Sequence, residues 1–109
     1  NILNVPLSSG AGTPEIHKAY EGLILPALAK FAPDMLFISA GFDAHKDDPL
    51  AGLMFTTDDY IWLSEQLCEF AQQNCQGRLV SVLEGGYNLT ALADSVSAHV
   101  RTLMTYASL

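Results

Sequence analysis

Three short apolar runs, each followed by a segment with helical periodicity, constrain the fold of this chain more than any other feature. The runs occupy residues 2–5, 35–39 and 79–83 and are predicted to be strands. Strands that alternate with helices usually pair in parallel, because each helix carries the chain back across the sheet. We therefore predict an α/β fold with three consecutive strand–helix units and a parallel sheet.

The first helix is predicted to begin with Thr13 as its N-cap and Pro14 at its first position. Apolar residues then recur at helical spacing as far as Phe31. Pro26 should bend this helix, because a proline ring crowds the turn before it. Gly22 lies four residues earlier, where the smallest side chain leaves the most room.

The other two helices follow the second and third runs. One is predicted to start near Thr57 and to stop at Gly77, and the last extends from about Leu89 to Tyr106. The run at residues 35–39 is continuously apolar, which is typical of a strand buried on both faces. Three strands make only a small sheet, so residues 1–109 are predicted to be one partial domain that belongs to a larger sheet or pairs with another chain.

Charge and composition narrow the classes of partner and compartment. Twelve acidic against five basic side chains give a net charge of −7, which argues against direct binding to nucleic-acid phosphates. No apolar run approaches the roughly 20 residues that cross a bilayer, and nothing resembles a signal peptide. Cys68 and Cys75 are expected to be reduced thiols in a cytoplasmic protein. The start at Asn1 suggests a processed or truncated product.

In open α/β sheets, ligands bind beyond the carboxyl ends of the strands. The middle of the three loops there, from about residue 40 to 56, is far longer than the usual roughly 2–6 residues, which suggests a function or an interface. It holds Asp43, His45, Asp47 and Asp48. Asp43 and His45 could ligate a metal such as zinc, or the aspartates could be turn formers in a solvated loop.

The third loop, residues 84–88, reads Glu-Gly-Gly-Tyr-Asn. Gly85 and Gly86 allow backbone angles that other residues avoid, and they permit close approach to a bound group. Neither dinucleotide-binding nor P-loop spacing is present, so a nucleotide site is only weakly indicated. Tyr87 is either a capped surface aromatic or a phenol presented into a site, and composition leaves both open.

The last two loops together resemble the histone deacetylase/acetylpolyamine amidohydrolase superfamily. Residues 39–50 (SAGFDAHKDDPL) are similar to the loop that bears the last zinc-binding aspartate of that family, and residues 83–89 (LEGGYNL) to its catalytic-tyrosine motif. Residues 4–7 (NVPL) also resemble the family at the preceding strand. The residues of these motifs resemble the class II and bacterial branch of the family more closely than class I. The resemblance implies the C-terminal part of the arginase/deacetylase fold.

The resemblance also implies roles for individual residues. Asp43 would be a zinc ligand, and Tyr87 would donate a hydrogen bond to the oxyanion of a tetrahedral intermediate. Gly85 and Gly86 would let the turn bring the phenol over the metal, and Leu50 would line the substrate channel. The implied reaction is zinc-dependent hydrolysis of an N-acetyl amide, in acetyl-lysine or a related acetylated amine. Leucine at position 50 favours acyl-lysine over polyamine substrates.

The same resemblance implies an incomplete active site. His45 falls where the family has no ligand, while the other two zinc ligands and a histidine pair lie upstream in the family. His17 and His99 match none of these and are expected to be surface or packing residues. The chain alone is therefore expected to bind no zinc and to be inactive without the missing N-terminal part of the domain. The alternatives are a non-catalytic module that acts through homo-oligomerisation or partner binding and, more weakly, a small-molecule or nucleotide-binding module.

Overall fold

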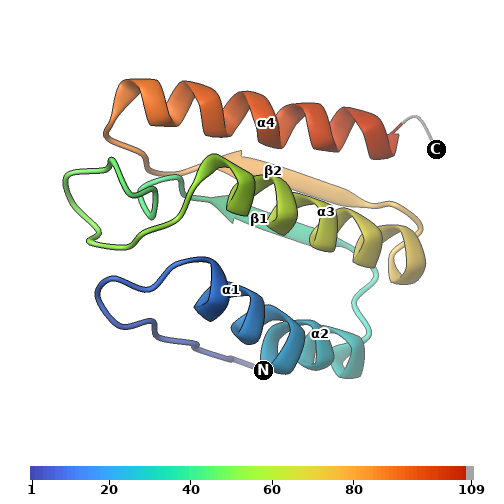
Figure 1. The fold of residues 1–109 in the computed structure, drawn as a ribbon. Coiled ribbons are helices and arrows are strands. Elements are labelled where there is room, and N and C mark those ends of the chain that lie inside the picture. The colour runs from blue at the N-terminus through green and yellow to red at the C-terminus, as the bar shows by residue number, and fades with distance from the viewer. Residues whose placement is uncertain (108–109) are drawn as a thin grey trace.

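The computed structural model describes residues 1–107 as a layer of helices packed on a small sheet (Figure 1). The elements follow one another as α1 (Thr13–Ala19), the π-helical turn η1 (Tyr20–Ile24), α2 (Leu25–Phe31), β1 (Leu36–Ala40), α3 (Thr57–Asn74), β2 (Leu79–Leu83) and α4 (Leu89–Ala107). This order confirms the predicted α/β class.

The sheet consists of two parallel strands within residues 1–107. Leu36 pairs with Leu79 and the register continues to Ala40 opposite Leu83. The predicted bounds of β2 are confirmed, and β1 begins one residue later than predicted.

The predicted strand at residues 2–5 is wrong, because that segment forms no strand in the structure. The segment lies at the N-terminus beside α1 (Figure 1), and the side chain of Ile2 is 84% exposed. An apolar run becomes a strand only where a neighbouring strand satisfies its backbone hydrogen bonds. Among the described residues, β1 and β2 pair only with each other, so this segment does not lie along either edge of the sheet as a paired strand.

The first helical region differs from its prediction at both its start and its middle. The N-cap is Gly12, not Thr13, and the Gly12 amide donates to the Glu15 carboxylate at 2.8 Å. The expected bend at Pro26 takes the form of the π turn η1 directly before α2, where the Leu25 amide donates to the Tyr20 carbonyl five residues earlier. π turns are rare and occur mostly as single turns within α-helices, where they interrupt the regular helical ladder.

The ends of α3 agree with the sequence. Thr56 is its N-cap, and the Thr56 amide donates to the Asp59 carboxylate at 2.8 Å. At the other end, Gly77 has a positive φ of 74° and its amide donates to the Ala71 carbonyl at 2.9 Å. Both features are standard helix caps, and the sequence predicted the stop at Gly77 and a start near Thr57, although not the cap at Thr56 itself.

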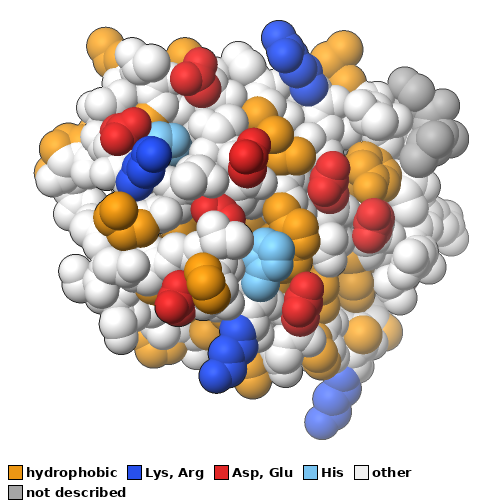
Figure 2. All heavy atoms as spheres, in the orientation of Figure 1, with side chains coloured by type: hydrophobic (Ala, Val, Ile, Leu, Met, Phe, Trp, Pro, Cys, Tyr) orange, Lys and Arg blue, Asp and Glu red, His pale blue; other side chains and the backbone are white. Residues whose placement is uncertain are grey.

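The helices pack against one face of the sheet, with α3 in front of the strands and α4 and α1–α2 on either side (Figure 1). Two buried clusters fill this layer. One comprises Ile16, Ala40, Phe42, Phe55 and Tyr60, and the other Leu36, Phe70, Ala71 and Cys75. Seen from the helical side, acidic side chains are scattered over the surface with apolar patches between them (Figure 2).

The opposite face of the sheet is bare. Side chains alternate along a strand, so Leu36 and Ala40 are buried while Phe37 between them is 71% exposed. On β2, Val80 and Val82 are also exposed. The expectation of a strand buried on both faces is therefore not met within residues 1–107, and this chain leaves an apolar sheet face without cover.

No helix among the described residues is long and apolar enough to cross a membrane.

Candidate functional site

The loops that follow β1 and β2 meet at the carboxyl end of the sheet. The hydrogen bonding of the strands continues past their ends, since the Glu84 amide donates to the Ala40 carbonyl at 2.9 Å and the Phe42 amide to the Gly85 carbonyl at 2.8 Å. Phe42 itself is buried in the core. The backbone at residues 40–42 and 84–85 is thereby held in a defined position directly beside Asp43.

The carboxylate of Asp43 occupies space that two glycines leave open. A Cβ atom at Gly41 would lie 3.1 Å from Oδ1 of Asp43, and a Cβ atom at Gly85 would lie 3.4 Å from its Oδ2. The contact at Gly41 is tighter than ordinary packing allows, so a larger residue there would displace the carboxylate, whereas the contact at Gly85 is an ordinary van der Waals distance. The sequence predicted Asp43 and Gly85 as site residues, and the structure brings them together.

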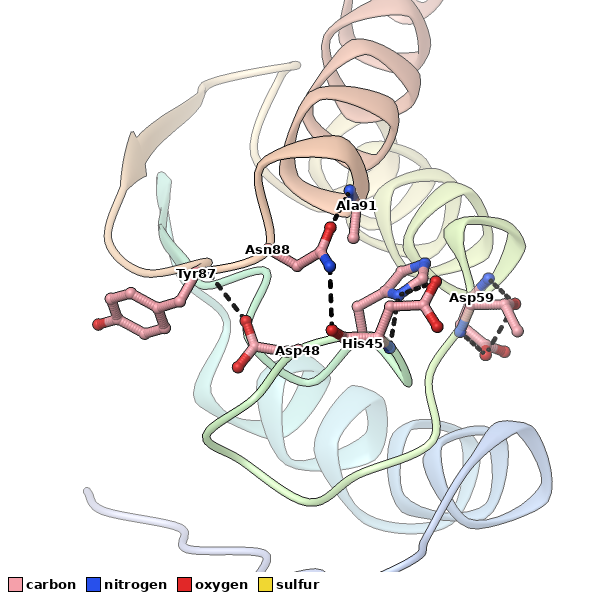
Figure 3. Close-up of polar contacts among 8 residues, drawn as sticks. His45, Asp48, Asp59, Tyr87, Asn88 and Ala91 are labelled. Carbon is pink, nitrogen blue, oxygen red and sulfur yellow. Dashed lines mark hydrogen bonds and ion pairs between the residues drawn. The ribbon is translucent and has the colours of Figure 1, made fainter.

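The hydroxyl group of Tyr87 reaches the same place. It would lie 3.2 Å from a Cβ atom at Gly85, so the Tyr87 Oη and the Asp43 carboxylate both lie within 3.5 Å of one point. The Tyr87 side chain is 55% exposed and points outward from the turn (Figure 3). The hydrogen-bond donor of Tyr87 and the carboxylate of Asp43 therefore both lie near Gly85 at an open surface.

Gly86 meets a separate steric requirement. Its φ is 145°, and a Cβ atom there would come within 2.7 Å of the Leu92 side chain on α4 and 3.3 Å of Phe42 Cβ. The turn therefore packs against the core through Gly86 and faces the site through Gly85. The two adjacent glycines have different functions, which the sequence could not distinguish.

Asp48 joins the two loops (Figure 3). Its Oδ2 accepts a hydrogen bond from the Tyr87 amide at 2.8 Å, and its Oδ1 accepts one from the Leu50 amide at 2.9 Å. Partial burial would raise the pKa of Asp48, but the amides of four residues outweigh it and hold that pKa below its usual value. These residues are Tyr87, Leu50, Ala51 and Asn88.

Asn88 forms a second link between the loops. Its side-chain NH2 donates to the Asp47 carbonyl at 3.2 Å, and its Oδ1 accepts from the Ala91 amide at 2.9 Å, which caps the start of α4. Sequence analysis did not select Asn88, although asparagine immediately before a helical stretch is an N-cap signal that could have found it.

Leu50 lies on the exposed outer part of the long loop, with 67% of its surface accessible. This part of the loop is tied to the first loop, because the Gly10 amide donates to the Gly52 carbonyl and the Met54 amide to the Ala11 carbonyl, each at 2.8 Å. All three loops at the carboxyl end of the sheet are therefore connected.

His45 is buried and has a local role. Its Nδ1 accepts a hydrogen bond from the Asp47 amide at 3.1 Å, and Phe55 pairs with it in an isolated bridge. This arrangement organises the long loop and uses one ring nitrogen, so His45 is accounted for as a structural residue.

The other two histidines pack, as expected. His17 stacks on Trp62 with ring centroids 3.7 Å apart. His99 is buried on α4 between Ser64 and Ser81, with Nδ1 2.7 Å from one hydroxyl and Nε2 2.9 Å from the other. Burial lowers the pKa of His99 from its ordinary value of 6.5.

The described residues supply one carboxylate to a possible metal centre at this surface. No group of three or more histidine, cysteine or acidic side chains gathers into a metal-binding cluster within residues 1–107. Cys68 and Cys75 are free thiols buried in the helical layer, away from the loops. A catalytic zinc ion takes three protein ligands, so these residues alone fit a zinc site only in part.

A parallel sheet whose strand ends bring a carboxylate and a phenol to the same glycine defines an α/β protein with a candidate polar site at the carboxyl ends of its strands. The chain belongs to the histone deacetylase family, because residues 1–103 match the histone deacetylase domain.

Similar proteins support this assignment. The chain is 45% identical to histone deacetylase 10, chloroplastic, of Oryza sativa over 98% of its length, and 44% identical to histone deacetylase 14, chloroplastic, of Arabidopsis thaliana, also over 98%. The crystal structure of the HDA15 HD domain superimposes on 91% of the chain with a TM-score of 0.82 and 33% identity.

The matched part of each relative is small. The chain covers 24% of the rice protein, 25% of the Arabidopsis protein and 27% of the HDA15 chain. It therefore spans about a quarter of the length of these relatives and corresponds to a partial deacetylase domain.

Proposed function

We propose that this chain is the C-terminal part of a zinc-dependent deacetylase domain that hydrolyses N-acetyl amides, with acetyl-lysine as the favoured substrate class. The observation that carries the proposal is the meeting of the Asp43 carboxylate and the Tyr87 hydroxyl over Gly85. Leu50, exposed beside this surface and joined to Asp48, would form part of the mouth of the substrate channel.

Asp43 would supply one of the zinc ligands in the complete domain. When bound, zinc polarises the acetyl carbonyl and acidifies a water molecule. Gly41 and Gly85 leave open the space that this carboxylate occupies at the surface. The remaining ligands and the general base would come from the N-terminal part of the domain, so the chain alone would be inactive.

Tyr87 would act on the substrate carbonyl. A phenol is a hydrogen-bond donor, and from its position near Gly85 it would stabilise the oxyanion that forms when water attacks the acetyl group. Its exposed position at the end of the turn leaves room for a substrate to approach.

The test is a deacetylase assay with an acetyl-lysine peptide on the complete domain that contains this chain. Tyr87→Phe should lower kcat by about 10²–10³-fold, the usual cost of losing one oxyanion donor. Tyr106→Phe is the matched control, because that phenol bonds Glu69 on the helical side. Equal activity of Tyr87→Phe and Tyr106→Phe would contradict the assignment, as would deacetylation by the 109-residue chain alone.

A second candidate function rests on the bare sheet face formed by Phe37, Val80 and Val82. An apolar surface of this kind favours association, so a non-catalytic module that acts by homo-oligomerisation or partner binding is the alternative. A cytoplasmic location and the absence of direct nucleic-acid contact remain proposals, the second supported by the net charge of −7.

A further inference from the structure

We propose that Asp48 is a positioning residue that sets the Tyr87 phenol relative to the Asp43 carboxylate, an inference that rests on the proposed deacetylase function. Asp48 lies 39 residues from Tyr87 in sequence and bonds its backbone amide directly. It contacts neither the acetyl group nor the metal in this account. Its effect on the reaction would pass through Tyr87.

Local turn formation explains only half of the contacts of Asp48. The bond from the Leu50 amide to Oδ1 spans two residues and is an ordinary aspartate turn. The bond from the Tyr87 amide to Oδ2 joins two different loops at 2.8 Å. A turn former has no need of the second contact, so the carboxylate has a tertiary role as well.

Asp48 restrains the turn at Tyr87 itself, in addition to the strand hydrogen bond at Gly85 and the packing of Gly86 on the core. Gly85 and Gly86 precede the tyrosine, and two consecutive glycines give a backbone its greatest conformational freedom. The Tyr87 ring is more than half exposed, so packing around the side chain restrains it only weakly. A charge-assisted bond at the Tyr87 amide is stronger than a neutral one and acts at the base of the side chain.

The restraint also connects the phenol to the substrate mouth. The same carboxylate holds the amides of Tyr87 and Leu50, so the oxyanion donor and the residue that would line the channel share one anchor. Asn88 supports this anchor from the side through the Asp47 carbonyl. A shift of about 1 Å in a catalytic group can cost roughly 10²-fold in rate, which makes such an anchor significant.

The test compares Asp48→Asn with Asp47→Asn in the complete domain. Both changes remove one negative charge from the same loop, but the Asp47 side chain is 60% exposed and its carboxylate lies 3.8 Å from Nδ1 of His45. Asp48→Asn leaves an NH2 donor facing one of the two backbone amides. We expect it to lower kcat by about 10–10²-fold, and Asp47→Asn to change kcat by less than about twofold.

A double substitution separates positioning from general damage. In a Tyr87→Phe background, Asp48→Asn should cause less than about a further twofold loss of kcat, because the group it positions is gone. Independent, multiplicative losses would overturn the proposal. Equal effects of Asp48→Asn and Asp47→Asn on kcat would overturn it too.

Amide hydrogen exchange in the 109-residue chain keeps the inference distinct from the proposed function. The Tyr87 amide should exchange at least about tenfold faster in Asp48→Asn than in Asp47→Asn, while amides within β2 remain unchanged. If the complete domain proves inactive, the proposed function fails and this exchange measurement still decides whether Asp48 holds Tyr87. An unchanged Tyr87 amide would overturn the positioning role.

Discussion

The two faces of the β1–β2 sheet differ more than any other two regions of this molecule. One face carries Leu36 and Ala40 into two buried clusters beneath α1–α4, while the other presents Phe37, Val80 and Val82 without cover. Parallel sheets are normally covered on both faces. Within residues 1–107 the helices cover one face of the sheet, and no part of this range covers the other face.

The largest expected difference between the two faces comes from removing one phenylalanine side chain from each of them. Phe70 is buried on α3 against Leu36, and Phe70→Ala should cost about 3–5 kcal/mol of the free energy of unfolding, the usual range for a buried phenylalanine. Phe37→Ala on the bare face should cost less than about 0.5 kcal/mol. Urea denaturation of the two variants measures both values, and similar losses would show that the bare face is covered in solution.

The next largest expected effect is on the dissociation constant for self-association through the bare face. If the bare face pairs with a second copy, Phe37→Glu should weaken self-association at least about tenfold, because an unpaired charge in an apolar contact costs well over about 1 kcal/mol. Val100→Glu is the control, since Val100 is exposed on α4. Sedimentation equilibrium measures the dissociation constants, and a Phe37→Glu chain that associates as tightly as the unmodified chain would remove the oligomer alternative.

The smallest expected effect is on the pH dependence of the free energy of unfolding, and it comes from His99 on the covered face of the sheet. Burial lowers the pKa of His99 below 6.5, so the unfolded chain takes up a proton first as the pH falls. The stability from neutral His99 is present above about pH 6.5 and is lost below it, at no more than about 1.4 kcal/mol per pH unit. Between pH 7 and 5, urea denaturation should give a shallower pH dependence for His99→Gln. An unchanged slope would mean that His99 is not the responsible group.

The sequence was sufficient where structure is locally encoded. β2 has an apolar run bounded by Gly77 and Gly85, and α3 has a threonine cap, so their bounds were predicted closely. The strand predicted at residues 2–5 failed because strand formation depends on a neighbour, which no local pattern reports.

In the candidate site too, residues in local motifs were predicted, whereas contacts between distant segments were not. Asp43, Gly85 and Tyr87 were found through their motifs, and the structure brings all three together. The bond between Asp48 and Tyr87 joins positions 39 residues apart, and the two hydroxyl partners of His99 lie on other elements. Such contacts follow from tertiary packing and could not be predicted from residue types alone.

The most direct test of the central claim is the zinc content of the complete domain, measured by elemental analysis for the unmodified protein, Asp43→Asn and Asp47→Asn. We expect about one zinc ion per chain in the unmodified protein and in Asp47→Asn, and a large loss of zinc in Asp43→Asn, because a catalytic site has only three protein ligands. Full zinc retention by Asp43→Asn would contradict the claim that this chain contributes a metal ligand to a deacetylase active site.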